Sequence, residues 1–418
     1  MQTIALALII LLGLLLLGQG VLVLGLACGL RRYKSPLLAD HECPKAAVVL
    51  CLRGTDPFLA NILLALLDQD YPDYEVRVII DSREDPAWEL VQNVVSRLDA
   101  PPVRIEALEQ IRNTCSLKCS SLIQAVTGLD ESYQVVAQID ADTLPHKTWL
   151  RELVTPLRDD RVGAATGNRW YMPEQPTVGA MVRYLWNACA IVQMYWYHIA
   201  WGGTLAVKTS VIRKCGLVER WGKAFCEDTM LYEVLRKEQL RVAFVPSLMM
   251  VNREQCTLGG FFHWVTRQLL TARLYHPKFS SVIAHGVLVT IVSGVTIVCV
   301  LVALLQQEGT IALTIAGAWI IYELGLMLFI VPMEVAVRNI ALARGQPTDW
   351  IKPKTFLTGL LAVFLLQIVY PAALFRSLTV TIVDWRGVCY RLGRSGALEL
   401  IQYVPFIQER AGNEKNSL

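Results

Sequence analysis

The sequence contains 418 residues, of which 54% are apolar and 18% are charged. Soluble globular proteins average about 45–50% apolar and about 25% charged residues, so this composition excludes an ordinary soluble protein. The net charge of +3 gives none of the basic excess that nucleic-acid-binding proteins use, and we expect no nucleic acid partner.

The N-terminal segment is strongly apolar. Residues 3–30 contain no charged side chain, and this run exceeds the ~20 residues that cross the hydrocarbon core of a bilayer. A secretory signal peptide has a shorter apolar core, and here the basic cluster Arg31-Arg32-Tyr33-Lys34 follows the run. We therefore predict that residues 1–34 form a retained transmembrane anchor whose C-terminal end faces the cytosol.

Residues 45–255 have the pattern of an α/β domain. Runs rich in β-branched residues predict strands at 46–52, 74–80, 134–139 and 162–167. Between the first two runs, the segment DPFLANILLALLDQDYP has helical spacing, with Asp56 at the expected N-cap position. Strands that alternate with helices predict a mostly parallel sheet, which binds ligands at the carboxyl ends of its strands.

Two aromatic segments differ from the rest of this region. Residues 179–203 are apolar and rich in Trp and Tyr, with a few polar interruptions. They could form a buried helix, a marginal membrane span or an amphipathic helix at the membrane surface, and the aromatic content favours the surface. Residues 256–280 predict a second amphipathic interfacial helix that leads into the membrane.

The C-terminal region 281–375 contains three long apolar runs, at 281–305, 310–334 and 355–375. The link after the first run has no positive charge and is predicted to face outside, whereas the next link is basic. The tail 376–418 is basic as well, so two basic segments flank one apparent span. Pro371 interrupts the last run, which leaves open whether this run spans the membrane or is re-entrant.

Acidic residues stand where a sheet of this kind presents its ligands. Asp81 follows the strand at 74–80, Asp140 and Asp142 follow the strand at 134–139, and Glu227-Asp228 are predicted to open a helix. Taken singly, each has an ordinary structural explanation, because strand ends are often acidic and acidic residues complement the helix dipole.

The combination of these acids predicts a chemical function. Asp140 and Asp142 point to the same side of an extended segment, so both reach one bound group. Mg2+ or Mn2+ prefers oxygen ligands, usually one or two carboxylates and substrate phosphates. The pattern favours a sugar-nucleotide transferase, in which the divalent metal neutralises the leaving diphosphate and a carboxylate deprotonates the acceptor hydroxyl.

The order of these residues resembles glycosyltransferase family 2, which has the GT-A fold, and especially its ceramide glucosyltransferase-like and bacterial lipid-glycosylating members. The resemblance covers roughly 45–275 and part of the tail. It lies in the stretches CLRGTDPFL (51–59), QDYPDYEV (69–76), SREDPA (82–87), WGGTLAVKTSVI (201–212), CEDTM (226–230) and WRGVCYRL (385–392). It implies an α/β GT-A domain, resembling nucleotide-diphospho-sugar transferases, within a multi-pass α-helical membrane protein.

The resemblance also implies roles for individual residues. Asp228 matches the general base, and Asp142 matches the metal ligand. Arg267 matches an arginine that offsets diphosphate charge. The positions that match donor-binding residues are Arg53, Asp81, Lys118 and Asp140.

One motif departs from the family pattern. A Gln/Arg-x-x-Arg-Trp motif is expected around Arg267, but Trp264 replaces its first residue and Gln268 replaces the Trp that stacks on the acceptor in polymer-extending members. Together with Glu227, these two residues are candidates for acceptor or interface contacts. The change counts against a sugar-polymer acceptor.

The sequence thus predicts an inverting glycosyltransferase with its catalytic domain on the cytosolic face of a membrane. It would transfer glucose or a related hexose from a nucleotide-sugar, most simply a UDP-sugar, to the hydroxyl of a ceramide-like membrane lipid. Two alternatives remain: a processive polysaccharide synthase on the same fold, and a non-catalytic membrane scaffold.

Overall fold

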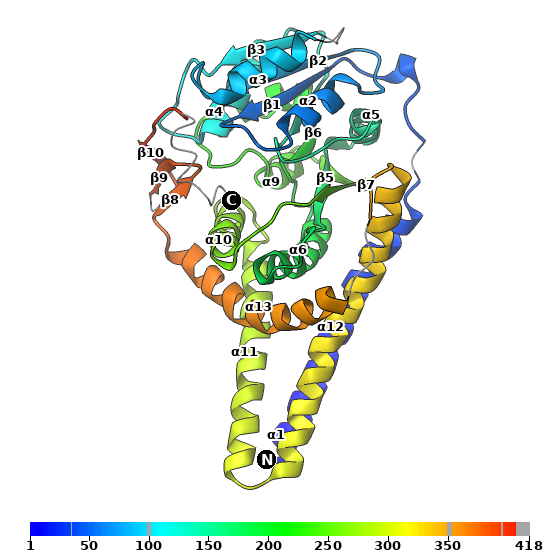
Figure 1. Cartoon of the computed structure of the whole chain (residues 1–418), viewed down its shortest axis with the longest axis vertical. Coiled ribbons are helices and arrows are strands. Elements are labelled where there is room, and N and C mark those ends of the chain that lie inside the picture. Colours follow the sequence, from blue (N-terminus) through cyan, green and yellow to red (C-terminus); the bar gives the residue numbers. More distant parts are fainter. Residues whose placement is uncertain (35, 98–101, 349–352, 394–395, 407–418) are drawn as a thin grey trace.

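The computed structural model describes residues 1–418 except 35, 98–101, 349–352, 394–395 and 407–418. An α/β domain forms the upper part of the molecule, and long helices project from it in one direction (Figure 1). Another long helix crosses the base of the domain.

The central sheet of the domain is mixed and mostly parallel, as predicted. Its order is β3-β2-β1-β4-β6-β5-β7, and β6 runs antiparallel to both of its neighbours. Among the described residues its strands are β1 (Ala46–Leu52), β2 (Tyr74–Ile80), β3 (Val103–Ala107), β4 (Val135–Ile139), β5 (Val162–Tyr171), β6 (Thr204–Lys208) and β7 (Arg241–Asn252).

The register of the parallel strands aligns their carboxyl ends. Leu52 of β1 pairs with Ile80 of β2, and Leu50 of β1 pairs with Ile139 of β4. The residues that follow these three strands therefore come together at one edge of the sheet. Because successive strand side chains point to opposite faces, the apolar residues of β1 contribute to a core on each side of the sheet.

Helices cover both faces of this sheet. Several begin at a residue whose side chain accepts a hydrogen bond from the first turn; Asp85 caps α3 and Ser116 caps α4 in this way. In the described part of the domain the helices are α2 (Leu59–Leu67), α3 (Pro86–Val95), α4 (Leu117–Thr127), α5 (Trp149–Val154), α6 (Val178–Tyr197), α7 (Thr209–Lys214), α8 (Leu217–Trp221), α9 (Leu231–Lys237) and α10 (Leu258–Tyr275).

Four helices are long and apolar enough to cross a membrane, judged by length and composition within the described residues. They are α1 (Gln2–Arg32), α11 (Phe279–Leu305), α12 (Gly309–Ala343) and α13 (Pro353–Thr379). Helices α1, α11 and α12 run alongside one another away from the domain, with α1 packed against α12 (Figure 1).

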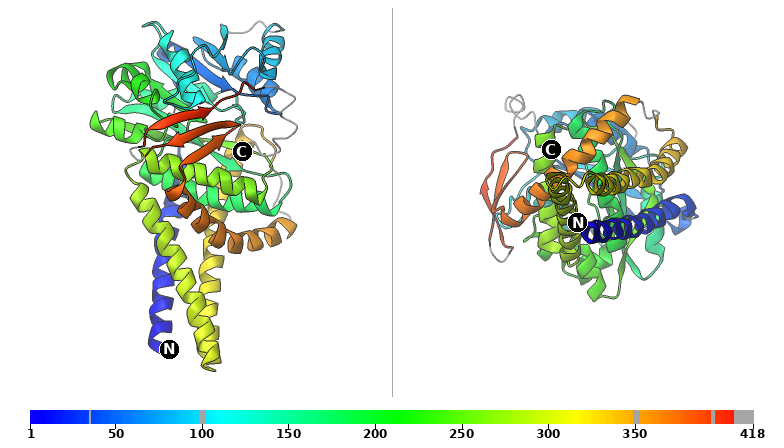
Figure 2. Two further views of the ribbon diagram at one scale, coloured as in Figure 1. Left: turned by 90° about the vertical axis from the view of Figure 1, so that its left-hand side faces the viewer. Right: turned by 90° about the horizontal axis from the view of Figure 1, so that it is seen from below.

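Helix α13 has a different direction. It lies across the base of the domain and packs against α6 and α10, where its Ala362, Ala373 and Leu374 are buried (Figure 2). It continues through Pro371 without a re-entrant turn. Because α13 does not run with α1, α11 and α12, the described basic residues Arg344 and Arg376 at its two sides do not imply opposite faces of a membrane.

A small antiparallel sheet follows α13 and rests against the domain (Figure 2). Its strands are β8 (Ile382–Trp385), β9 (Val388–Leu392) and β10 (Leu398–Gln402). Tyr390 of β9 packs edge-on against Phe225 of the domain, and its hydroxyl oxygen accepts a hydrogen bond from the N–H of Leu117 at 3.1 Å. The tail thus reaches the carboxyl edge of the central sheet.

Three local predictions were wrong. Asp56 does not cap α2, which begins after Phe58, because its carboxylate pairs with Arg386 instead. Glu227 and Asp228 lie in a turn before α9 and do not open that helix, which begins at Leu231. The helix expected over 179–203 ends at Tyr197, where His198 adopts a left-handed conformation with φ of 55°.

Candidate active site

A pocket with a cavity of about 210 Å³ lies at the carboxyl edge of the central sheet. It is lined by side chains from the domain, from α10 and from the small C-terminal sheet. Its basic and acidic lining residues are Arg53, Lys118, Arg169, Arg267, Arg386, Asp81, Asp140, Asp142, Glu227, Asp228 and Glu254. Every residue predicted for the site from the sequence lines this one pocket, including Trp264 and Gln268.

Arg53 and Asp81 close one end of the pocket. They follow the paired strands β1 and β2, so their side chains meet, and the guanidinium of Arg53 forms an ion pair with the carboxylate of Asp81. The N–H of Asp81 also donates to the carbonyl of Leu52 at 3.0 Å, which fixes the end of β2 against β1. The Asp81 side chain is only 1% exposed.

Lys118 connects two of the acids. Its Nζ lies 2.6 Å from Asp140 Oδ1 and 2.7 Å from Glu227 Oε1. Burial alone would lower the pKa of Lys118, but the two carboxylates outweigh it and hold that pKa well above 10.5. For Glu227, burial has the opposite effect and raises the pKa, and the charge of Lys118 partly offsets this rise. The lysine therefore remains charged and keeps both acids in place.

Asp142 has a different environment from Asp140. Its Oδ1 accepts a hydrogen bond from Thr143 at 3.1 Å, and its Oδ2 lies 3.5 Å from the amide nitrogen of Asn252. In the described part of the chain, it forms no ion pair. Burial and the charge of Asp140 disfavour the ionised form of Asp142 and so raise its pKa. A cation beside Asp142 would offset both effects and favour the carboxylate.

The donor set fits a hard divalent cation held jointly with a substrate. No group of three His, Cys, Asp or Glu residues within the described ranges could enclose a metal by itself. Mg2+ and Mn2+ sites of this kind commonly use one or two carboxylates and complete their coordination with phosphate oxygens and water. Asp142 provides such a carboxylate at the edge of the pocket, and the basic side chains around it suit a diphosphate.

Asp228 is held by the backbone. Its Oδ2 accepts a hydrogen bond from the N–H of Gly202 at 2.8 Å, and its Oδ1 accepts one from the N–H of Thr229 at 2.6 Å. The side chain is half-buried and faces the pocket without a cation partner among the described residues. This geometry leaves the carboxylate oriented and able to accept a proton from a hydroxyl group that enters the pocket.

Gly202 has no room for a side chain. A Cβ at this position would lie 2.0 Å from Glu227 Oε1 and 3.1 Å from Lys118 Nζ. Gly202→Ala is therefore expected to displace Glu227 and Asp228 together, to destabilise the protein by about 1–3 kcal/mol, and to reduce transfer strongly. Thermal melting and a transfer assay in detergent would measure both effects.

The matched control for this change is Gly259→Ala in α10, where nothing lies within 4 Å of an added Cβ. Gly259→Ala should leave both measurements close to wild type or raise the melting temperature slightly, since Ala favours a helix more than Gly does. Equal behaviour of the two variants would contradict the close fit at Gly202.

Lys118 is expected to be essential for the arrangement of the acids. Lys118→Met leaves the buried Glu227 without its partner and should lower the free energy of unfolding by about 3 kcal/mol. Lys118→Met/Glu227→Gln should recover much of this loss, because the buried carboxylate is removed as well. Chemical denaturation of the three proteins would test the coupling, and equal stabilities of the single and double variants would refute it.

Two further arginines face the pocket from α10 and from the C-terminal sheet. Arg267 stacks over the ring of Trp385 at 5.0 Å and has no ion-pair partner among the residues described. Burial lowers the pKa of Arg267 to about 10, with the nearby Arg386 adding to the effect, so the side chain remains charged at neutral pH. It is available for an anionic ligand.

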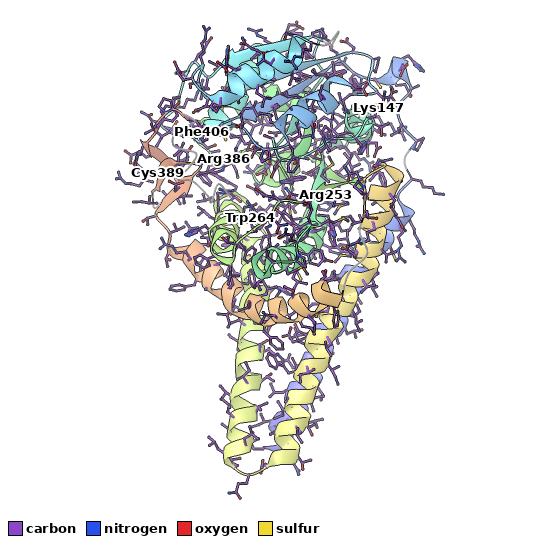
Figure 3. All side chains as sticks on the ribbon, viewed as in Figure 1. Lys147, Arg253, Trp264, Arg386, Cys389 and Phe406 are labelled. Atoms are coloured by element: carbon purple, nitrogen blue, oxygen red, sulfur yellow. The ribbon has the colours of Figure 1, made fainter. Side chains whose placement is uncertain are left out.

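Arg386 occupies the turn between β8 and β9. Its φ of 51° and that of Gly387, 74°, fit a two-residue hairpin in which Asn, Asp or Gly is usual at the first position. An arginine in this conformation costs about 1–3 kcal/mol, and it places the guanidinium 3.1 Å from Asp56 Oδ1 and 3.0 Å from the carbonyl of Arg53. Figure 3 labels Arg386, which joins the small C-terminal sheet to the domain through these contacts.

Sequence reasoning missed Arg169. Its guanidinium lies over the rings of Trp201 at 5.2 Å and Trp264 at 4.9 Å, on the side of the pocket nearest α6 and α10. Gln268 contacts it at 3.5 Å. The signal available was the charge of Arg169 next to Trp170 and Tyr171 in strand β5, because a charged side chain in a central strand is rarely buried without a partner.

Trp264 is part of the protein core as well as of the pocket wall. It is 3% exposed and packs edge-on against Tyr171 and Trp186. The wall nearest α13 is therefore aromatic, whereas the opposite end, at Arg53 and Asp81, is ionic.

Comparison with known families gives a match over nearly the whole chain. The family described as "Glycosyl transferase family 21" matches residues 10–398. The chain belongs to glycosyltransferase family 21. The assignment confirms the predicted class of enzyme, a glycosyltransferase, and the mixed, mostly parallel sheet is its GT-A-like domain.

One known protein is similar to this family 21 glycosyltransferase over a short stretch. A ceramide glucosyltransferase from Pyricularia oryzae (strain 70-15) is 34% identical over 68 residues, which is 16% of this chain and 14% of the relative. The match thus covers about a seventh of that protein's length.

Two solved structures are also similar. A mannosyltransferase from Pyrobaculum calidifontis in complex with GDP-Man and Mn2+ is 17% identical, with a TM-score of 0.49 over 89% of this chain and 98% of that one. Glucosyl-3-phosphoglycerate synthase from Mycobacterium tuberculosis, with Mn2+ and UDP, is 13% identical, with a TM-score of 0.36 over 57% and 85%. The family assignment rests on the sequence match alone.

Proposed function

We propose that the protein transfers one hexose from a nucleotide-diphosphate sugar to the hydroxyl of a membrane lipid, with inversion at the sugar carbon. The observation that carries this proposal is the distribution of charge in the pocket. A carboxylate suited to a metal, Asp142, and a backbone-held carboxylate, Asp228, face a cavity that four arginines and Lys118 also line. Such a set can bind a diphosphate and activate a hydroxyl group at the same time.

Each of these groups has a role in the proposed reaction. Asp228 accepts the proton of the acceptor hydroxyl as its oxygen attacks the sugar carbon. The bond from that carbon to the diphosphate oxygen breaks, and the diphosphate leaves with the electron pair. Arg267 and Arg386 stabilise the negative charge that develops there. Mg2+ or Mn2+ held at Asp142 would supply further charge neutralisation.

The arrangement of the helices supports a lipid acceptor. The pocket wall formed by Arg169, Trp264 and Gln268 lies on α10 and β5, above the apolar helix α13. If α1, α11 and α12 span a bilayer, α13 lies at its surface, and aromatic side chains favour that depth. The basic residues that flank α13 then favour the cytosolic side of the membrane for the domain and its tail.

The relatives support the donor class. The mannosyltransferase and the synthase described above hold GDP-Man and UDP, respectively, each with Mn2+. The ceramide glucosyltransferase resemblance favours UDP-glucose and a ceramide-like acceptor for this chain.

Expression in a host that lacks glycolipids, followed by mass spectrometry of the lipid extract, tests the proposal. We expect a lipid that carries a single added hexose, and its absence in cells that express Asp142→Asn. A polymeric product would favour the processive synthase, and no sugar-modified product with any nucleotide-sugar would favour a scaffold. Either result would overturn the proposed function.

A further inference from the structure

The chain's own C-terminal segment 403–406 lies on the ionic end of the pocket. The hydroxyl of Tyr403 donates to Asp81 Oδ1 at 3.1 Å, and the N–H of Phe406 donates to Asp81 Oδ2 at 3.1 Å. Arg53 donates from Nη2 to the carbonyl of Val404 at 2.9 Å. Three polar contacts therefore hold this segment against the ion pair between Arg53 and Asp81.

Aromatic contacts reinforce this placement. The guanidinium carbon of Arg53 lies 5.6 Å from the ring centroids of both Tyr403 and Phe406. The ring of Phe406 rests against Gly54, where a Cβ would lie 2.7 Å from it, and the φ of Gly54 is 75°. Figure 3 labels Phe406 beside Arg386, whose carbonyl accepts a hydrogen bond from Arg53 at 2.9 Å.

These groups have the chemistry of a nucleotide base. A base offers a flat aromatic face and ring N–H donors, and proteins bind it by stacking and by hydrogen bonds to its edge. Here the Phe406 ring provides the face, and its own N–H and the Tyr403 hydroxyl provide the donors. Both oxygens of Asp81 are engaged, and its side chain is 1% exposed, so no base can reach it while the segment is bound.

Arg53 and Asp81, which the segment contacts, line the cavity, and this cavity is small. Its volume of about 210 Å³ falls below the ~300–1,000 Å³ typical of ligand pockets. Residues 398–402 of β10 tether the segment to the small sheet, so it remains close to Asp81 at a high effective concentration.

We propose that residues 403–406 occupy the nucleotide-base subsite of the donor-free protein and compete with the donor, so that the C-terminal segment is autoinhibitory. This inference rests on the proposed function, because it takes the ligand of Asp81 to be a nucleoside diphosphate. The segment leaves Asp81 when the donor binds, and the apparent Kd of the donor is raised by the fraction of protein in which the segment is bound.

Titration of the full-length protein with UDP and Mn2+ tests the proposal. Tyr403→Phe/Phe406→Ala removes one hydrogen bond and one aromatic ring while leaving Arg53 and Asp81 intact, and it should lower the apparent Kd for UDP by about tenfold. Gln402→Ala, at an exposed position next to the segment, is the matched control and should bind UDP as the wild type does.

Hydrogen exchange gives a second measurement. The amide of Phe406 should exchange slowly in the nucleotide-free protein and faster when UDP and Mn2+ are added. Unchanged or weaker UDP binding by the double variant would overturn the competition, since the segment would then be neutral or part of the base pocket. If neither the wild type nor the variant bound UDP or GDP with Mn2+, the proposed function itself would fail.

Discussion

Replacing Asp228 by asparagine is expected to lower kcat by about 10²–10⁴-fold, the usual contribution of a general base, and to leave the Kd of UDP with Mn2+ unchanged. Asparagine retains the shape of the side chain, and its single amide oxygen can accept the N–H of Gly202, whereas the N–H of Thr229 loses its acceptor. It cannot accept the proton of the acceptor hydroxyl. Transfer measured in vesicles and UDP titration would separate the two effects.

The control for this change is Asp160→Asn, at an exposed position of the same domain, which should leave both measurements unchanged. Melting temperatures of the variants and the wild type should agree within a few degrees. Retention of wild-type kcat in Asp228→Asn would remove Asp228 from the reaction and reopen the assignment of the base.

Asp142→Asn is expected to abolish the Mn2+-dependent part of nucleotide binding and to lower transfer by about 10³-fold. A neutral amide oxygen is a much poorer ligand for a hard cation than a carboxylate. The neighbouring Asn252 amide, 3.5 Å from Asp142 Oδ2, has no charge with which to replace it. UDP titrations with Mn2+ and with EDTA would measure the change directly.

The EDTA titration is the internal control, because wild type and Asp142→Asn should bind UDP equally without a metal. A variant that still bound UDP more tightly with Mn2+ than with EDTA would place the metal on other residues. Together, the Asp142 and Asp228 variants separate metal binding from proton transfer, and a non-catalytic scaffold would show neither effect.

The carboxyl edge of the sheet could be predicted from the sequence because its geometry is local. β-branched runs define β1, β2 and β4, and parallel pairing brings the residues that follow them together. Asp81, Asp140 and Asp142 could therefore be assigned to one site before the fold was known. The short spacing of Asp140 and Asp142 needs only an extended segment.

Contacts between distant parts of the chain could not be predicted in this way. Asp56 has the sequence context of a helix cap, but Arg386 takes its carboxylate from 330 positions away. The turn at Glu227 depends on Lys118 and on the missing side chain of Gly202. No local sequence pattern indicates these partners, so the helix start expected at Glu227-Asp228 was wrong.

Hydropathy also carries no information about direction. The most apolar stretches of helices α12 and α13 have the same mean hydropathy of 2.0, yet α12 runs away from the domain and α13 lies across its base (Figure 1). The packing of α13 against α6 and α10 decides this, and that packing depends on residues such as Trp264 and Met181. The segment 403–406 gives no periodic signal at all.

Helix α13 fixes the distance between the pocket and the ends of the projecting helices. A lipid acceptor then reaches the pocket by diffusion in the plane of the bilayer. The concentration that determines the transfer rate is therefore the mole fraction of acceptor within the bilayer. Diluting the acceptor with inert lipid at constant bulk concentration should slow the enzyme, whereas adding more vesicles of the same composition should leave the rate per enzyme unchanged. Lipid composition, and not the total amount of acceptor in the cell, would set its turnover.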